Sequence, residues 1–405
     1  MGNISIYSEI GKLNKVILHR IGPEVEGLVP ENFERLLFDD IPFLKVAQRE
    51  HDNFAKTLRD CGAEVIYLVD ELAKVLADPQ LKKQFVAEML DESGIKSPGV
   101  LEALEDYLLA KEPKDMVDSI IKGIKKEEVT HIKAKTLADL ISSAYPFYLD
   151  PLPNAYFTRD PGAFVGNGMS VHPMCTETRR REALLFKYLY QYDRDLVPEG
   201  TQLLYGFEDK PSLEGGDIHV LNDKVLALGL GSRTTAKGIE GFAESIFKNT
   251  GFNKILVFDI PKTRAYMHLD TLFTMVDHDK FAIHPEMERL DQRFVITPKA
   301  EGKADLEVVT EPLDDMLKNA LGLPAVELIH CGGGDELAAQ REQWSDAANV
   351  LAVEPGKVIA YARNYITNAM MEKAGIEVIR VSGSELSRGR GGTRCMCCPV
   401  DRSAL

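Results

Sequence analysis

Four short stretches of the sequence carry residue types that could do chemistry together. They span residues 154–160 (NAYFTRD), 214–217 (EGGD), 268–270 (HLD) and 388–395 (RGRGGTRC). Between them they supply a thiol, an imidazole and several carboxylates. A cysteine near a histidine provides a nucleophile and a proton shuttle. We therefore expect covalent catalysis if the fold brings the four stretches to one pocket.

The number of acids narrows the class of substrate. Carboxylates would repel the negative charge that develops during ester or amide cleavage. They suit a cationic substrate, because a planar guanidinium donates paired hydrogen bonds to carboxylates. The set therefore favours amidine or guanidine chemistry. Each stretch alone also has an interpretation that involves no chemistry. Glu-Gly-Gly-Asp is more often a turn, and His-X-Asp is usually a solvated pair.

The composition is that of an acidic globular chain. Its 405 residues include 48 lysines and arginines against 63 aspartates and glutamates, and the net charge of −15 disfavours nucleic acid as a partner. No apolar run approaches the ~18 residues that a membrane span needs. The N-terminal residues lack the basic and apolar regions of an export signal. We therefore expect a cytoplasmic protein that does not bind a membrane.

The positions of the cysteines favour a chemical role over a role in stabilising the fold. Six cysteines in this length are too dilute for a disulfide scaffold, yet Cys395, Cys397 and Cys398 cluster near the C-terminus. No second pair of ligands lies at the spacing of a zinc site. We expect no metal and no other cofactor.

The elements that must position these stretches recur along the chain. Near residues 160, 214, 270 and 349, two apolar runs separated by a turn predict a hairpin, and in most copies a helix and a further strand follow. A shorter copy begins near residue 12. A single unit cannot bury its own sheet face, so we predict a closed, pseudo-symmetric five-bladed α/β propeller. An ordinary mixed α/β sheet is the alternative.

Residues 71–143 break this pattern. Helical spacing with glycine and proline punctuation predicts helices over 78–94, 98–115 and 116–132, and a short one over 137–146. We therefore predict a catalytic propeller made of residues 1–70 and 144–405, and a helical insertion domain over 71–143. The insertion could be a packed bundle, a lid or an assembly surface.

Together these features resemble the arginine deiminase family of the guanidine-modifying (pentein) superfamily. The resemblance covers nearly the whole chain, including the insertion, and rests on Asn154 with Phe157-Thr-Arg-Asp-Pro, Leu-Glu-Gly-Gly-Asp217, His268-Leu-Asp270 and Gly389-Arg-Gly-Gly-Thr-Arg-Cys-Met396. It implies a hydrolase acting on the C–N bonds of linear amidines. Such an enzyme converts L-arginine to L-citrulline and ammonia in arginine catabolism, through a covalent S-alkylthiouronium intermediate. The resemblance also implies a homo-oligomer, a dimer or a tetramer.

The resemblance also implies a role for each residue of the site. Cys395 would be the nucleophile, and His268 would act first as general acid and then as general base. Asp160 and Asp270 would hold the guanidinium, and Glu214 would orient His268. The substrate-binding residues that it implies are Asn154, Phe157, Arg179, Arg233, Gly389, Arg390 and Asp217. Of these, Arg179 and Arg233 would meet the α-carboxylate of the substrate.

Several alternatives remain open from the sequence. Agmatine deiminases, dimethylarginine hydrolases and amidinotransferases share the Cys-His-acid core, but agmatine has no carboxylate for Arg179 and Arg233 to bind. The Arg-Gly-Arg-Gly-Gly segment over 388–392 resembles an RNA-binding motif, although it occurs once in an acidic chain. A catalytically silent scaffold is a third possibility. Cys397 departs from the family pattern, in which a small hydroxyl residue is more usual, so three neighbouring thiols compete for the role of nucleophile.

Overall fold

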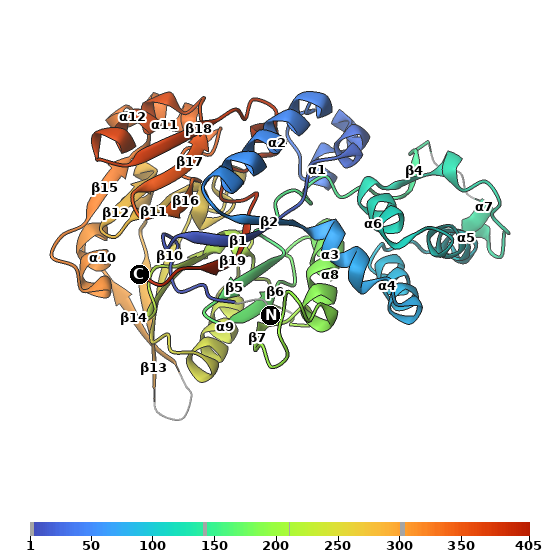
Figure 1. The fold of residues 1–405 in the computed structure, drawn as a ribbon, viewed down its shortest axis with the longest axis horizontal. Coiled ribbons are helices and arrows are strands. Elements are labelled where there is room, and N and C mark those ends of the chain that lie inside the picture. The colour runs from blue at the N-terminus through green and yellow to red at the C-terminus, as the bar shows by residue number, and fades with distance from the viewer. Residues whose placement is uncertain (1–3, 141–143, 210, 300–303) are drawn as a thin grey trace.

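The repeated element of the fold is a small mixed sheet (Figure 1). The computed structural model describes residues 4–140, 144–209, 211–299 and 304–405. In each of these sheets an antiparallel pair of strands is followed by a parallel pair, and a connection that contains a helix joins the parallel strands. Parallel neighbours need such a crossover, because a tight turn can join only antiparallel strands. The α/β class predicted from the sequence is confirmed.

Two such sheets follow the helical region. The first consists of β5 (Gly162–Val165), β6 (Gly168–Val171) and β7 (Leu203–Tyr205), and helix α8 (Glu177–Tyr192) connects β6 to β7. The second contains β8 (Ile218–Val220), β9 (Val225–Leu230), helix α9 (Ala236–Asn249) and β10 (Lys254–Asp259). The Thr235 hydroxyl caps α9 by accepting a hydrogen bond from the Gly238 backbone N–H at 3.2 Å. Both predicted hairpins are therefore present.

Two further sheets have the same order. One contains β11 (Phe273–Asp277), β12 (Lys280–Ile283), helix α10 (Leu313–Leu321) and β15 (Glu327–His330). The other follows α11 (Glu336–Gln343) and contains β16 (Leu351–Glu354), β17 (Lys357–Tyr361), helix α12 (Tyr365–Lys373) and β18 (Glu377–Val381). The sequence did not predict the hairpin of β13 (Arg293–Pro298) and β14 (Ala304–Val309), which widens the β8–β10 sheet by pairing β13 with β10.

The two ends of the chain share one sheet. Its order is β19-β1-β2, made from β19 (Cys398–Arg402), β1 (Leu13–Leu18) and β2 (Glu64–Tyr67), and helix α2 (Leu44–Asp60) connects β1 to β2. Figure 1 shows β1 and β19 side by side, one near each end of the colour scale. The last strand thus supplies the antiparallel partner that the N-terminal unit lacks in its own sequence.

The predicted helical insertion is mostly helical. Its helices are α3 (Leu68–Val75), α4 (Pro79–Asp91), α5 (Pro98–Leu109), α6 (Pro113–Lys122) and α7 (Leu137–Leu140). The helix predicted over 116–132 is wrong beyond Lys122, because Gly123 adopts a φ of 80° and β3 (Ile124–Lys125) then pairs with β4 (Phe147–Leu149). Residues 141–143, at the end of the predicted insertion, lie outside the described residues. Figure 1 shows α4 to α7 as a lobe at one side of the sheets.

The helices next to the sheets bury an apolar stripe. In α9 the buried residues Ile239, Phe242 and Ile246 recur every three or four positions and join a core cluster with Leu226 and Leu228 of β9. The short helix α1 (Phe33–Leu36) lies between β1 and α2 in the sequence. Among the described residues, no helix is long and apolar enough to cross a membrane.

Candidate active site

Residues from three of the four predicted stretches line one narrow cavity. Its lining consists of Leu37, Asn154, Phe157, Asp160, Arg179, Arg233, Arg264, Met267, His268, Thr271, Gly389, Arg390 and Cys395. Its volume is about 20 Å³. A cavity needs roughly 10–15 Å³ to hold one water, so a molecule the size of an amino acid can enter only if side chains move. Glu214, from the remaining stretch, lies directly behind His268.

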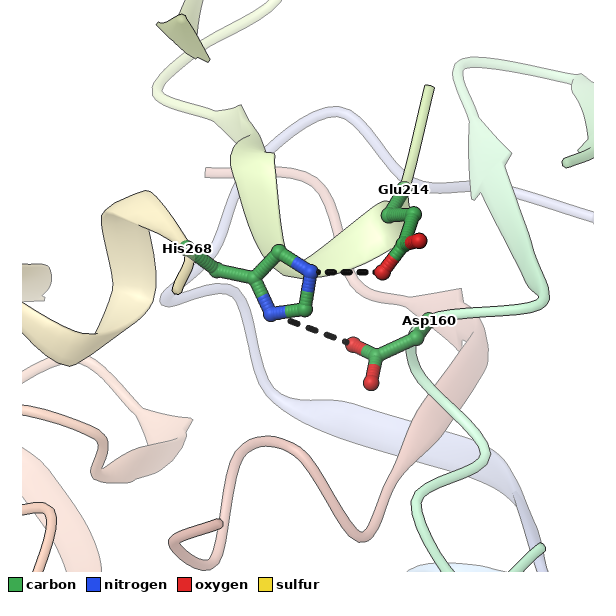
Figure 2. A group of neighbouring side chains, drawn as sticks. All are labelled: Asp160, Glu214 and His268. Carbon is green, nitrogen blue, oxygen red and sulfur yellow. Dashed lines mark hydrogen bonds and ion pairs between the residues drawn. The ribbon is translucent and has the colours of Figure 1, made fainter. Parts of the chain in front are cut away.

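His268 is held between two carboxylates. Its Nε2 lies 2.8 Å from Glu214 Oε2 and its Nδ1 lies 3.8 Å from Asp160 Oδ1, as Figure 2 shows. Burial alone would lower the pKa of His268, but the carboxylates of Asp160 and Glu214 outweigh it and raise that pKa to about 9. Although burial opposes the shift, His268 and Arg233 lower the pKa of Glu214 to about 2. Near neutral pH the group is therefore an imidazolium between two acids.

The same three side chains have the geometry of a possible metal site. Ligand atoms of Asp160, Glu214 and His268 all lie within 4.8 Å of one another. A metal must bind a ring nitrogen through its lone pair, and an imidazolium has protons on both nitrogens. With a pKa of about 9, His268 would have to lose a strongly held proton before it could bind a cation. The arrangement therefore favours a proton over a metal ion near neutral pH.

The Cys395 thiol contacts one carboxylate and one amide. Its Sγ lies 3.4 Å from Asp270 Oδ2 and accepts a hydrogen bond from Asn349 Nδ2 at 2.9 Å. Arg394 in turn donates from Nη1 to Asp270 Oδ2 at 2.9 Å. Burial raises the pKa of the Cys395 thiol well above its usual value, and Asp270 and Asp160 raise it further. The resting side chain is therefore a neutral thiol.

Two buried carboxylate oxygens of the site accept no hydrogen bond from the described residues. Asp160 accepts a hydrogen bond from Arg179 on Oδ2 at 2.7 Å, and Asp270 uses Oδ2 for Arg394 and Cys395. Neither Asp160 Oδ1 nor Asp270 Oδ1 has a hydrogen-bond partner among the described residues. Buried acceptors normally have partners, so the two oxygens are suited to receive donors from a ligand.

The glycines of the second stretch bring two sheets together. Leu269 N–H donates to Asp217 Oδ1 at 2.8 Å, which ties the β8 unit to the segment that carries His268. A Cβ on Gly216 would lie 2.6 Å from the His268 ring, so glycine is required for this close approach. Asp217 itself does not line the cavity, and burial raises its pKa to about 7. It acts on the site through the backbone that carries His268.

The predicted arginines differ in their surroundings. Arg179 is already committed, since it donates to Asp160 and, from Nε and Nη2, to Glu182 Oε2. Arg233 Nη1 has no hydrogen-bond partner in the described part of the chain. The same holds for the three guanidinium nitrogens of Arg390, whose guanidinium lies 3.6 Å above the Trp344 ring. Arg233 and Arg390 therefore each bring to the cavity guanidinium nitrogen that has no hydrogen-bond partner among the described residues.

Asn154 and Phe157 line the cavity from the side of the first stretch. Asn154 Nδ2 donates to the Leu36 carbonyl at 2.8 Å, which ties the stretch to the end of α1. The Phe157 ring packs against the backbone of Gly389 and Gly391. The glycine-rich approach to Cys395 thus makes room for an aromatic ring of the protein itself.

The other two thiols of the cluster face away from the cavity. Cys397 is fully buried in a hydrophobic cluster, and Cys398 Sγ donates to the Gly162 carbonyl at 3.4 Å. Burial raises both pKa values to about 12. Residues 389–392 are also buried, and the half-exposed Arg388 pairs with Asp40 and Glu385, so the segment over 388–392 is not the exposed arginine-glycine segment that an RNA-binding motif requires.

Sequence reasoning missed three polar groups of the site. Asn349 contacts the thiol, Arg394 forms buried ion pairs with Glu9 and Asp270, and the buried Asp346 has two unpartnered carboxylate oxygens among the described residues. One signal could have found Asn349. It lies two residues before the first strand of its sheet, as the predicted stretches lie shortly before theirs.

Comparisons with known proteins agree with this site. The sequence profile described as "Arginine deiminase" matches residues 34–402. The chain is 47% identical over 408 residues to an arginine deiminase of Streptococcus pneumoniae (strain P1031), covering 99% of both proteins, and 46% identical to that of Streptococcus agalactiae, covering 99% of this chain and 98% of that protein.

Solved structures resemble the fold at low identity. A dimethylarginine dimethylaminohydrolase (DDAH) variant from Pseudomonas aeruginosa, complexed with citrulline, has a TM-score of 0.53 at 15% identity and covers 96% of this chain and 99% of that one. The amidinotransferase SxtG from Microseira wollei has a TM-score of 0.55 at 14% identity, covering 99% and 98%. The profile match over residues 34–402 and the 47% identity over the full length show that the chain belongs to the arginine deiminase family.

Proposed function

We propose that the protein hydrolyses L-arginine to L-citrulline and ammonia, with Cys395 as the nucleophile. The observation that carries the proposal is a pair of buried carboxylate oxygens, Asp160 Oδ1 and Asp270 Oδ1, that accept no hydrogen bond from the described residues. The other oxygen of Asp270 lies 3.4 Å from the Cys395 thiol. Two acceptors at this place match the N–H donors of a guanidinium. The relatives at 47% identity, which are named arginine deiminases, support the same reaction.

Binding of the cationic substrate prepares the thiol for attack. In the free enzyme, Asp160 and Asp270 oppose ionisation of Cys395 by like-charge repulsion. A guanidinium that pairs with both acids neutralises this repulsion. We infer that the substrate itself promotes loss of the Cys395 proton to water, so that the thiolate forms next to the guanidinium carbon.

The reaction then proceeds in two halves. The thiolate of Cys395 forms a bond to the guanidinium carbon, and His268, protonated at the start, gives a proton to the departing amine. Ammonia leaves and an S-alkylthiouronium remains on the sulfur. Neutral His268 then takes a proton from a water whose oxygen bonds to the same carbon. The C–S bond breaks, the remaining hydroxyl proton passes to the departing sulfur, and this step restores the neutral Cys395 thiol as the ureido group of citrulline forms.

The charged end of the substrate distinguishes arginine from agmatine. Arg233 and Arg390 present unpartnered guanidinium nitrogens to the cavity, and a carboxylate is their natural ligand. Asn154 and Phe157 line the same cavity. Arg179 is proposed to act less directly than the sequence suggested, because Asp160 and Glu182 already occupy its guanidinium. It would orient Asp160 as well as contribute positive charge.

The test measures citrulline and ammonia from purified protein given arginine without added metal or nucleotide. We expect turnover of arginine at least ~100-fold above that of agmatine. The variant Cys395→Ser should form no citrulline, whereas the matched control Cys397→Ser should keep most activity. Equal turnover of agmatine would contradict the substrate, and activity in Cys395→Ser would contradict the nucleophile.

The architecture of the whole protein is part of the same proposal. We propose that the five repeated sheets close into a five-bladed propeller, a view supported by the pairing of β19 with β1. Residues 1–70 and 144–405 would form this catalytic unit, and 71–143 the helical insertion. A cytoplasmic homo-oligomer remains our expectation. Light scattering on the purified protein measures its mass and tests the assembly.

A further inference from the structure

Asn349 makes the shortest polar contact of the Cys395 thiol. Its side chain is 1% exposed and contacts the cysteine twice. Asn349 Oδ1 accepts from the Cys395 backbone N–H at 3.0 Å, and Nδ2 donates to Sγ at 2.9 Å. A backbone N–H can only donate, so the oxygen of the amide must face it. The N–H of the amide must therefore point at the sulfur.

The sulfur thus lies between one donor and one acceptor. As a thiol, Cys395 can donate to Asp270 Oδ2 and accept from Asn349. As a thiolate it is repelled by Asp270, Asp160 and Asp346, while Arg394 attracts it. The neighbouring hydroxyls are engaged elsewhere, since Tyr156 donates to the Leu386 carbonyl and Tyr361 to the Gly391 carbonyl. Within the described residues, Asn349 is the hydrogen-bond donor that reaches the sulfur.

The backbone of Asn349 is fixed independently of its side chain. Its N–H donates to the Asp346 carbonyl at 3.0 Å, and Thr393 accepts from Leu351 N–H at 3.2 Å. Thr393 also donates to the Ile359 carbonyl at 2.7 Å. These bonds hold the segment before β16 against the segment that carries Cys395. The amide is therefore pre-organised toward the sulfur before any substrate binds.

We propose that Asn349 is a positioning residue of the reaction, whose amide N–H stabilises the Cys395 thiolate and aims it at the substrate carbon. The inference rests on the proposed function, in which Cys395 is the nucleophile. When a guanidinium neutralises Asp160 and Asp270, the hydrogen bond from Asn349 remains and favours the ionised sulfur. None of the motifs recognised in the sequence includes this residue.

The experiment compares Asn349→Asp and Asn349→Ala with the wild type. Asp keeps the shape of the side chain but replaces the donor with an acceptor. The first readout is the rate at which iodoacetamide alkylates Cys395 as a function of pH, followed by mass spectrometry of its peptide. The second is kcat and KM for arginine. The matched control is Asn368→Ala on α12. It removes a buried amide that donates a hydrogen bond to the Tyr361 carbonyl at 3.0 Å.

We expect alkylation and kcat to fall by about 10- to 100-fold in both Asn349 variants, as a lost hydrogen bond to a charged acceptor implies. The pH of half-maximal alkylation should rise, most in Asn349→Asp, while KM changes less than about threefold. Wild-type alkylation in Asn349→Asp would overturn the inference, and so would an equal loss in Asn368→Ala. If the wild type did not turn over arginine, the proposed function would fail while the alkylation comparison still tested Asn349.

Discussion

Replacing Glu214 with glutamine should shift the pH dependence of the reaction without dismantling the site. Glu214 Oε2 lies 2.8 Å from His268 Nε2, and a glutamine oxygen can accept the same hydrogen bond. The variant loses the charge and also one acceptor, because Glu214 Oε1 accepts a hydrogen bond from the Cys175 backbone N–H at 3.0 Å. A hydrogen bond to a charged group contributes about 1.5–3 kcal/mol and a neutral one about 1 kcal/mol, so the loss is about 0.5–2 kcal/mol. Since one pKa unit equals about 1.4 kcal/mol, the His268 pKa should fall by about one unit.

The direction of the kinetic change follows from the role of His268 as an acid. Its pKa of about 9 keeps the imidazolium available through neutral pH, and Asp160 remains 3.8 Å away in the variant. In Glu214→Gln the alkaline limb of kcat should therefore move to lower pH by about one unit. Activity well below that limb should fall much less. The protonation of His268 can be followed directly by NMR of the labelled ring.

The control must remove a buried carboxylate that does not touch His268. Glu342 is buried and caps α12 by accepting from the N–H groups of Ile366 and Thr367. The variant Glu342→Gln should lower stability but leave the alkaline limb in place. An unmoved limb in Glu214→Gln, with the His268 ring titrating as in the wild type, would refute the assignment of Glu214 as the group that holds its proton.

Three further predictions test the charged end of the cavity, the metal and the buried histidines. Arg233→Ala should raise KM for arginine by an amount on the order of 2–5 kcal/mol while agmatine changes far less, and an equal effect on both substrates would make Arg233 structural. Dialysis against a chelator should leave citrulline formation unchanged, and a loss that a divalent cation restores would contradict the protonated state of His268. Burial lowers the pKa of His51 to about 3 and that of His172 to about 4, so only the unfolded chain takes up these protons between about pH 6.5 and 4. Stability should therefore fall as the pH drops below about 6.5, by up to about 1.4 kcal/mol per unit for each histidine, and His51→Leu should reduce that slope in urea unfolding.

The sequence predicted those parts of the fold that are encoded locally. The hairpin of β11 and β12 and the Thr235 cap of α9 each depend on a few consecutive residues. The pairing of β19 with β1 joins Cys398 to Ile17 across nearly the whole chain, and no local pattern announces it. The same limit explains why the helix predicted beyond Lys122 is wrong. The spacing of polar residues there is typical of a helix, but β3 pairs with β4, which follows α7 in the sequence.

The candidate site was predictable where a residue type carries its own chemistry. Cysteine, histidine and glycine-flanked acids stand out in any sequence, and the structure brings Cys395, His268 and Asp160 into one cavity. Asn349 carries no such mark, since an asparagine before a strand is usual in turns. Its importance depends on contact with Cys395, 46 residues later in the chain. Reactive groups are thus visible in the sequence, and the groups that tune them depend on the tertiary structure.

Repetition of the sheet unit explains how residues so far apart form one site. Asp160, Asp270 and Asn349 each lie two or three residues before the first strand of their sheet, and Cys395 lies three before β19. Each of these polar residues therefore lies at the same end of a strand. When the sheets pack together, their side chains come close to one another. Cys395 is held by segments near both ends of the chain. The preceding residue, Arg394, donates hydrogen bonds to Glu9 as well as to Asp270. Cys395, the proposed nucleophile, is therefore positioned only when the first and last segments are both folded, which couples completion of the fold to assembly of the candidate site.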